Sequence, residues 1–231
     1  MDLKLTGRTA LVTGSSKGIG LAVAQWFARE GVNVCLVARS GDRLEKEGAA
    51  IAKETGVTVR TLAADLADAS ARERVFQTFP DVDILVNNAG AIPGGSLDDV
   101  DEAAWRAGWE LKLYGYIGLT RLYLEKMKAR QRGVIVNIIG AGGERLDPMY
   151  IVGAVGNCYL IQFDKLETDQ PLPPMELHTL GELSAICQNC DQKLANLFKS
   201  RDDMMRWIAW LTKPEKPAGQ SGKVVHLKKP H

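Results

Sequence analysis

The feature that most constrains this chain is a glycine-rich run set between a strand-like and a helix-like segment. Residues 13–20 read TGSSKGIG, after the apolar run 9–12 and before the apolar-periodic segment 21–27. Glycine lets a backbone approach a phosphate closely, and a helix N-terminus offers free N–H groups and a positive dipole to an anion. This order of segments predicts a dinucleotide site; a tight turn without a ligand is the alternative. The candidate cofactor-binding residues of the loop are Gly14, Ser16, Lys17, Gly18, Ile19 and Gly20.

Short apolar segments alternate with amphipathic ones along the first two-thirds of the chain. Such alternation predicts an α/β fold, a doubly wound parallel sheet with helices on both faces, in a single domain over residues 1–231. The strand candidates, rich in Val, Ile and Leu as doubly buried strands are, are Thr9–Thr13, Val32–Val37, Val57–Leu62, Asp83–Asn87 and Val134–Ile139. The helix candidates are residues 17–30, 41–55, 68–78, 101–128 and 148–165.

From about Thr168 the pattern becomes irregular. Within this last third, 175–180 is a sixth strand candidate, 201–211 a helix candidate and 223–227 a final strand candidate, whereas 182–200 has no clear periodicity. We therefore expect a core at 1–165 and a divergent part at 166–231.

Composition excludes several classes of partner. Lys and Arg number 29 and Asp and Glu 28, a formal net charge of +1, so no charge field favours nucleic acid or an anionic membrane. The first residues lack the apolar core of a signal peptide, and no apolar stretch approaches the ~20 residues of a spanning helix. We expect a cytoplasmic protein whose ligands are small molecules, with no nucleic-acid or membrane partner.

The cysteine content gives no disulfide framework, because four cysteines in 231 residues are too few for one. Cys35 and Cys158 are predicted to pack as small hydrophobic residues. Cys187 and Cys190 could form half of a zinc site with His178, but a second pair is missing, and packed or reactive thiols are the better interpretation.

Three further motifs, together with the glycine loop, carry a family resemblance. They are AADL at 63–66, NNAG at 87–90 and VNI at 136–138. Their order and spacing over residues 5–165 resemble the short-chain dehydrogenase/reductase family. The resemblance implies a Rossmann-type sheet, NAD(H) or NADP(H) as cofactor, and hydride transfer to or from a carbonyl or alcohol substrate.

The resemblance also implies roles for individual cofactor residues. Asp65 would accept from the adenine amino group with help from the Leu66 backbone, and a surface cap is the alternative for this carboxylate. Asn87, Ala89 and Gly90 would let backbone pass close to the ribose, and Asn88 is a further candidate cofactor-binding residue. A purely structural role, locking the fourth strand to its neighbour, is the alternative, and both roles can hold together.

Charge distinguishes the two cofactors. An NAD site places a carboxylate after the second strand, whereas a 2′-phosphate requires a cation there. This chain has Arg39 at that point and Lys17 in the glycine loop, which together favour NADP(H). Asp42 nearby keeps NAD as the alternative.

The catalytic positions depart from the family. Its Asn, Ser, Tyr and Lys align with Lys112, Gly140, Gly153 and Asn157, so all four familiar groups are replaced. Tyr150 is the nearest phenol. If the helix started with Asp147 as N-cap, Tyr150 would share the face of Asn157, one turn early and leaning away from the nicotinamide.

Lys and Asn have exchanged places in this alignment, so the ammonium could enter the pocket from the opposite wall. The candidate catalytic residues are thus Lys112, Tyr150 and Asn157, although Lys112 could instead extend along a helix edge to solvent. Two functions follow: an NADP(H)-dependent oxidoreductase with a rearranged proton relay, or a catalytically dead NADP(H)-binding pseudoenzyme that acts as a sensor or partner subunit. A third interpretation is that the chain is an altered or truncated gene product.

A homodimer or homotetramer is also expected. The segments 101–128 and 148–165 have more apolar faces than one sheet can cover, and the resemblance implies a four-helix interface there.

Overall fold

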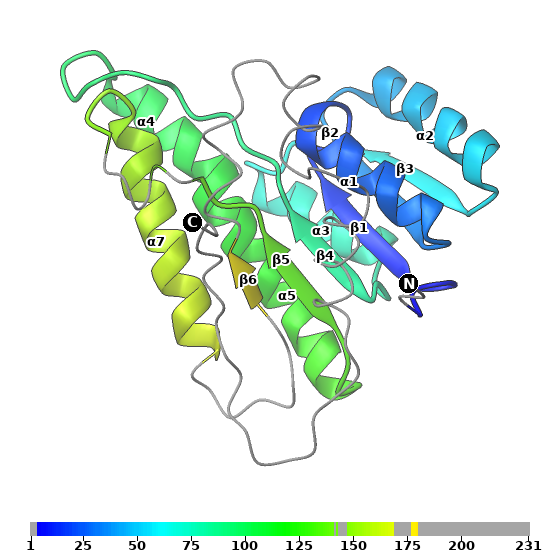
Figure 1. Ribbon diagram of the computed structural model, residues 1–231. Helices are drawn as coiled ribbons and strands as arrows, with labels where there is room; N and C mark the ends of the chain where they lie inside the picture. Colours follow the sequence, from blue (N-terminus) through cyan, green and yellow to red (C-terminus); the bar gives the residue numbers. More distant parts are fainter. Residues whose placement is uncertain (1–3, 141, 143–146, 169–176, 180–231) are drawn as a thin grey trace, which may run out of the picture.

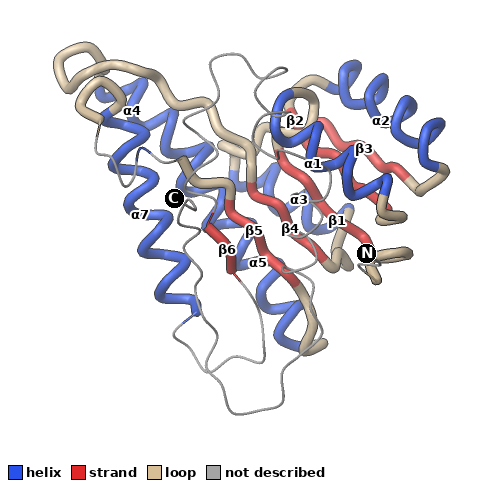
Figure 2. The backbone as a smooth tube through the Cα atoms, viewed as in Figure 1, coloured by secondary structure: helices blue, strands red, loops and turns tan. Residues whose placement is uncertain are grey.

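A six-stranded parallel sheet forms the centre of the computed structural model, which describes residues 4–140, 142, 147–168 and 177–179. The strand order is β3-β2-β1-β4-β5-β6, and every neighbouring pair is parallel (Figures 1 and 2). The strands are β1 (Thr9–Thr13), β2 (Asn33–Ala38), β3 (Val59–Ala63), β4 (Ile84–Asn87), β5 (Val134–Asn137) and β6 (Leu177–Thr179). The chain turns back between β1 and β4, where α/β folds place their ligand crevice at the carboxyl ends of the strands.

Helices connect the strands as parallel pairing requires. They are α1 (Gly18–Arg29), α2 (Gly41–Thr55), α3 (Ala69–Thr78), α4 (Glu102–Trp109), the π-helical turn η1 (Glu110–Tyr114), α5 (Gly115–Ala129) and α7 (Ile151–Thr168). Aspartate side chains cap two of them: Asp68 accepts from Ser70 N at the start of α3, and Asp101 accepts from Ala104 N at the start of α4. No helix in the described ranges has the length and apolar character needed to cross a membrane.

The sheet is covered on both faces because successive strand residues point to opposite sides. Ala10 and Val12 of β1 join a buried cluster with α1 and α2, to which Phe27 and Leu44 belong. Leu11 between them faces the other way, into a cluster formed with α3 and α5. Figure 1 shows these helix pairs on opposite sides of the sheet.

A third buried cluster joins α7 to the long helix. Leu113 of η1 and Tyr116 of α5 pack with Leu160 and Ile161 of α7. This packing fixes α7 beside η1, and so sets the two elements that carry Lys112 and Asn157 against each other.

The predicted sheet and helices are confirmed, with small differences in their limits. The strand over Thr9–Thr13 and the helix over 41–55 begin and end as expected. The other four predicted strands of the core shift or shorten by one or two residues. The sixth strand, predicted over 175–180, is Leu177–Thr179. The candidates at 201–211 and 223–227 lie outside the described residues.

Two differences between the predicted and the observed helices affect the position of the candidate site residues. The helix expected over 101–128 contains the π turn η1, in which one turn holds an extra residue. The helix expected from Asp147 instead begins at Ile151, because Asp147 closes a turn: its Oδ1 accepts from Met149 N at 2.9 Å and its carbonyl from Tyr150 N at 3.1 Å.

Candidate active site

The loop between β1 and α1 has the form that the sequence predicts. Gly14 (φ +66°) and Gly18 (φ +59°) adopt left-handed backbone conformations that favour glycine. Lys17 is the N-cap of α1, yet its side chain makes no capping bond, and no acidic residue lies in the first turn. In contrast to α3 and α4, this helix therefore begins with N–H groups that no cap satisfies, a suitable environment for an anion.

Close packing attaches the glycine loop to the end of β4. A Cβ atom at Gly14 would lie 2.9 Å from the Cα of Ala89, and one at Gly20 would lie 2.5 Å from Nδ2 of Asn88. Asn88 donates from Nδ2 to the carbonyl of Thr13 at 2.9 Å, and Thr13 Oγ1 accepts from both Asn88 N and Ala89 N. These glycines therefore bring the two sides of the β1–β4 crevice together.

Two cations lie at the carboxyl ends of the neighbouring strands β1 and β2. The pairing of Thr13 with Val37 puts both ends at one edge of the sheet. Lys17 and Arg39 follow these ends, and both are exposed, whereas Ser16 and Ile19 are partly buried. A phosphate at this edge could thus meet two positive charges.

The end of β3 carries the predicted adenine residues. Asp65 is exposed, and its Oδ1 accepts from Ala67 N at 3.1 Å, so this carboxylate already closes a turn. Leu66 is buried, and its carbonyl accepts from Arg72 Nη1 at 2.7 Å. The second oxygen of Asp65 has no bond in the turn, which leaves it able to accept from a ligand.

A buried amide pair joins β4 to β5 beneath the site. Asn87 donates from Nδ2 to Asn137 Oδ1 at 2.8 Å and to Thr120 Oγ1 at 3.1 Å. All three side chains are buried, so these bonds hold the two strands and α5 in one arrangement.

Lys112 extends from η1 toward the ends of β4 and β5, not into solvent. Its Nζ donates to the carbonyl of Ile138 at 3.1 Å, lies 5.0 Å from the ring centre of Tyr116, and is 3.7 Å from where a Cβ of Gly90 would be. The side chain is partly buried, and desolvation lowers the pKa of Lys112 from 10.5 to about 8.

Asn157 lies on the inner side of α7 with 1% of its surface exposed. Within the described residues, neither Oδ1 nor Nδ2 of this buried amide has a hydrogen-bond partner. Buried polar groups in folded proteins are nearly always satisfied, so an amide left without a partner indicates a ligand or water at that point.

The Tyr150 ring lies over Gly153, against the sequence-based expectation. A Cβ at Gly153 would overlap ring atoms Cε1 and Cζ of Tyr150 and lie 2.5 Å from its hydroxyl oxygen. The expected lean toward the helix N-terminus is wrong for this residue because Tyr150 precedes α7: its carbonyl accepts the first helical bond, from Ala154 N at 2.8 Å. It therefore has N-cap geometry, free of the helical rotamer restriction.

Tyr116 is a residue of the site that sequence reasoning missed. Its hydroxyl donates to the Ile138 carbonyl at 3.1 Å, the same acceptor that Lys112 uses. The available signal was the spacing of four residues from Lys112 on a helix, which places the two side chains on one face.

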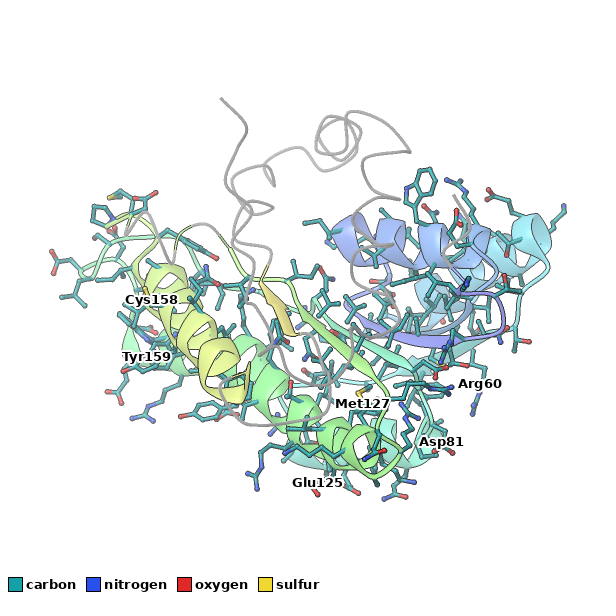
Figure 3. All side chains as sticks on the ribbon, turned by 60° about the horizontal axis from the view of Figure 1, so that its bottom comes forward. Arg60, Asp81, Glu125, Met127, Cys158 and Tyr159 are labelled. Carbon is teal, nitrogen blue, oxygen red and sulfur yellow. The ribbon has the colours of Figure 1, made fainter. Side chains whose placement is uncertain are left out.

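Two cysteines, Cys35 and Cys158, lie in the described core. Cys35 is buried as predicted, and burial raises its pKa to about 11; Cys158 is partly buried on α7. Figure 3 shows Cys158 and Tyr159 at the opposite end of the molecule from Arg60 and Asp81. No metal-binding group of three His, Cys, Asp or Glu exists among the described residues, and Cys187 and Cys190 fall outside them.

Comparison with known proteins gives a family match. The model of the family described as short chain dehydrogenase matches residues 8–152. The chain is 33% identical over 237 residues to the short chain dehydrogenase mpl6 of Monascus purpureus, covering 96% of this chain and 81% of that protein. It is 35% identical to the NADP-dependent (R)-specific alcohol dehydrogenase of Lentilactobacillus kefiri, over 64% of this chain and 60% of that one.

Solved structures show the same similarity. L-sorbose reductase from Gluconobacter frateurii, complexed with NADPH and L-sorbose, matches with a TM-score of 0.68 and 33% identity over 73% of this chain and 65% of that one. A short chain dehydrogenase/reductase family protein matches with a TM-score of 0.72 and 32% identity, over 78% and 74%. The chain spans 53% and 63% of the lengths of two uncharacterized oxidoreductases of Bacillus subtilis, YvaG and YvrD.

Proposed function

The chain belongs to the short chain dehydrogenase family, and on that premise we propose that it is an NADP(H)-dependent oxidoreductase. It would transfer hydride between the nicotinamide and a small carbonyl or alcohol substrate. In the reductive direction the carbonyl carbon takes the hydride and its oxygen takes a proton. Relatives whose names include an NADP-dependent alcohol dehydrogenase and an NADPH-bound sorbose reductase support this class of reaction.

The glycine loop fits the cofactor, since its helix starts without a side-chain cap and Gly14 and Gly18 adopt left-handed backbone conformations. The bound cofactor would supply the hydride. We assign the phosphates to the N–H groups at the start of α1, and the 2′-phosphate to Arg39 and Lys17. The adenine would meet Asp65 and the Leu66 backbone. The ribose on the nicotinamide side would lie against Asn88, Ala89 and Gly90.

The buried, unpartnered amide of Asn157 is the single observation that carries the catalytic assignment. It is oriented toward the space above Gly142, where Nδ2 lies 3.7 Å from the Cβ position, and the Tyr150 ring approaches that same position at 3.2 Å. Lys112 supplies a positive charge at the ends of β4 and β5. We propose Lys112, Tyr150 and Asn157 as the groups that bind the reacting oxygen and its proton.

The residue types at the aligned catalytic positions support a second function. In the alignment inferred from the sequence motifs, Lys112, Gly140, Gly153 and Asn157 stand where the family has its catalytic Asn, Ser, Tyr and Lys. A pseudoenzyme that binds NADP(H) and senses or signals its presence would keep the glycine loop and need none of these groups. The two functions share the cofactor site and differ only in turnover.

We propose that two or four copies assemble, through the long helix that contains η1 and through α7. Trp105, Trp109 and Tyr159 form a row of edge-to-face aromatic contacts between these helices, and Tyr159 is 58% exposed. Exposed aromatic surface of this kind supports an interface between copies.

The experiment that tests the function measures binding and turnover separately. NADPH binding to the purified full chain is measured by calorimetry, and NADPH oxidation is followed by absorbance with a panel of ketones and aldehydes. Binding with turnover supports the oxidoreductase. Binding without turnover of any member of the panel supports the pseudoenzyme, and the absence of binding rejects both.

A further inference from the structure

The ring of Tyr150 fills the volume that a side chain at residue 153 would occupy. A Cβ at Gly153 would overlap ring atoms Cε1 and Cζ, and the hydroxyl oxygen lies 2.5 Å from that Cβ position. Any residue other than glycine at this point would displace the ring. The overlapping atoms belong to a rigid aromatic ring, so rotation about a terminal side-chain bond cannot relieve the clash. The position of the phenol therefore depends on the absence of a side chain one turn further along the chain.

Backbone contacts hold Tyr150 at the start of α7. Gly95 pairs with it in an isolated β-bridge, in which Gly95 N donates to the carbonyl of Met149 at 2.8 Å and Ile151 N donates to the carbonyl of Gly95 at 3.3 Å. The Tyr150 carbonyl begins the helix by accepting from Ala154 N. Because the Tyr150 backbone is fixed on both sides, the direction of its ring is set mainly by which neighbouring space is open. Gly153 provides that space.

Tyr150 and Asn157 converge on a second glycine. Ring atoms Cδ1 and Cε1 of Tyr150 lie 3.2 and 3.5 Å from the Cβ position of Gly142, and Asn157 Nδ2 lies 3.7 Å from it. The ring edge of Tyr150, just before α7, and the unpartnered buried amide of Asn157, within α7, thus both approach the Gly142 position. The Tyr150 hydroxyl lies at the end of this ring, 2.5 Å from the Gly153 Cβ position. A phenol can donate a proton to an oxygen atom, and an amide can donate a hydrogen bond to the same atom.

We infer that Tyr150 is the phenol that passes the proton in this protein, and that Gly153 is the positioning residue that makes room for its ring. The inference rests on the proposed oxidoreductase function and deepens it. In reduction, the O–H bond of Tyr150 breaks and a new O–H bond forms on the carbonyl oxygen, while the carbonyl carbon accepts hydride from the reduced nicotinamide. The phenolate then regains a proton from solvent.

The test substitutes Gly153→Ala, with Gly156→Ala as the matched control. Both changes add one methyl group to α7, but a Cβ at Gly156 meets Trp109 Nε1 at 3.2 Å and does not approach Tyr150. We expect Gly153→Ala to lower the rate of reduction about a hundredfold, as small displacements of catalytic groups do, with unchanged NADPH affinity. Gly156→Ala should retain reduction within a few-fold. Equal rates for the two variants would overturn the inference while leaving the proposed function intact.

A second measurement does not depend on turnover. The full chain is labelled with 3-fluorotyrosine, and the Tyr150 resonance is assigned as the one that Tyr150→Phe removes. We expect this resonance to shift on addition of NADPH in the unaltered protein and in Gly156→Ala, and its position before addition to differ in Gly153→Ala. A Tyr150 resonance that ignores NADPH in a protein that binds it would overturn the inference. A failure to bind NADPH at all would overturn the proposed function and this inference with it.

A third experiment moves the phenol from residue 150 to residue 153. The double variant Tyr150→Gly with Gly153→Tyr puts the phenol at residue 153 and empties the space that the Tyr150 ring occupied. We expect it to recover reduction to within about tenfold of the unaltered protein, whereas Tyr150→Phe and Tyr150→Gly alone stay inactive. Full activity of Tyr150→Phe would show that this phenol passes no proton.

Discussion

Lys112 and Tyr116 donate hydrogen bonds to one acceptor, the carbonyl oxygen of Ile138, each at 3.1 Å. The Lys112 ammonium also lies 5.0 Å from the centre of the Tyr116 ring, a distance at which the ring face attracts a cation. The π turn η1 ends between the two residues, at Tyr114. Tyr116 is buried, so it forms a fixed support that keeps the ammonium at the ends of β4 and β5.

Lys112→Met is expected to abolish reduction while leaving NADPH affinity unchanged. The substitution removes the positive charge at the ends of β4 and β5 and keeps most of the apolar stem, which packs 3.4 Å from the Cβ position of Gly90. Initial rates and calorimetric titration give the two readouts. Lys126→Met is the matched control, since Lys126 is an exposed lysine of α5 with a long contact to Asp81. Undiminished turnover of Lys112→Met would remove this residue from the mechanism.

The rate of reduction should fall as pH rises through about 8. Desolvation lowers the pKa of Lys112 from 10.5 to about 8, so the ammonium loses its proton in that range. The unfolded chain, with the ordinary pKa, binds more protons between pH 8 and 10.5, so the free energy of unfolding should rise with pH across this window. Thermal melts of the unaltered protein and Lys112→Met, compared at each pH, isolate that contribution. A pH-independent difference between their melting temperatures would contradict it.

Removing the Tyr116 ring should shift this pH profile. In Tyr116→Leu the ammonium loses its cation–π contact, so the pKa of Lys112 should fall further, by about half a pH unit for an attraction of roughly 0.5–1 kcal/mol. Tyr123→Leu is the matched control: Tyr123 is also buried on α5, and its hydroxyl donates to the Phe79 carbonyl at 3.0 Å. Both variants should lose stability, but only Tyr116→Leu should move the pH at which the rate falls.

Arg39→Asp should reverse the cofactor preference. The unaltered protein is expected to bind NADPH more tightly than NADH, because Arg39 and Lys17 both follow strands that end at the same edge of the sheet. Loss of one charge-assisted phosphate bond corresponds to about 1.5–3 kcal/mol, roughly tenfold to a hundredfold in Kd. The new carboxylate could accept from a ribose hydroxyl and so favour NADH. Equal affinities of the unaltered protein for the two cofactors would refute the charge argument.

The sheet could be predicted from the sequence because strands buried on both faces have a composition that few other elements share. Thr9–Thr13 is continuous, apolar and bounded by the glycine loop, so its limits agree with prediction. The edge strand β3 (Val59–Ala63) carries exposed and partly buried residues, and there the predicted start at Val57 was two residues early. Burial on both faces, and not β-strand propensity alone, made the central strands predictable from the sequence.

The site itself was less predictable, because its geometry depends on tertiary contacts. The direction of the Tyr150 ring follows from the β-bridge to Gly95 and the open space at Gly153. Neither feature can be inferred from the hydrophobic periodicity of the sequence. The π turn at Lys112 was also missed, since an extra residue in one helical turn leaves the amphipathic pattern almost unchanged. The sequence predicted candidate residues for the site, and packing determined where their atoms lie.

Light scattering should show a dimer or tetramer of the full chain, and Tyr159→Glu should convert it to monomer. Tyr159 is 58% exposed and contacts the Trp109 ring, whose centroid lies 6.0 Å away, so a carboxylate there would place a charge within the proposed interface. Leu97→Glu is the control: Leu97 is 64% exposed but lies in the loop between β4 and α4. The control should keep the assembly of the unaltered protein. A monomer at every concentration of the unaltered protein, or an assembly that Tyr159→Glu leaves intact while Leu97→Glu disrupts it, would reject this interface.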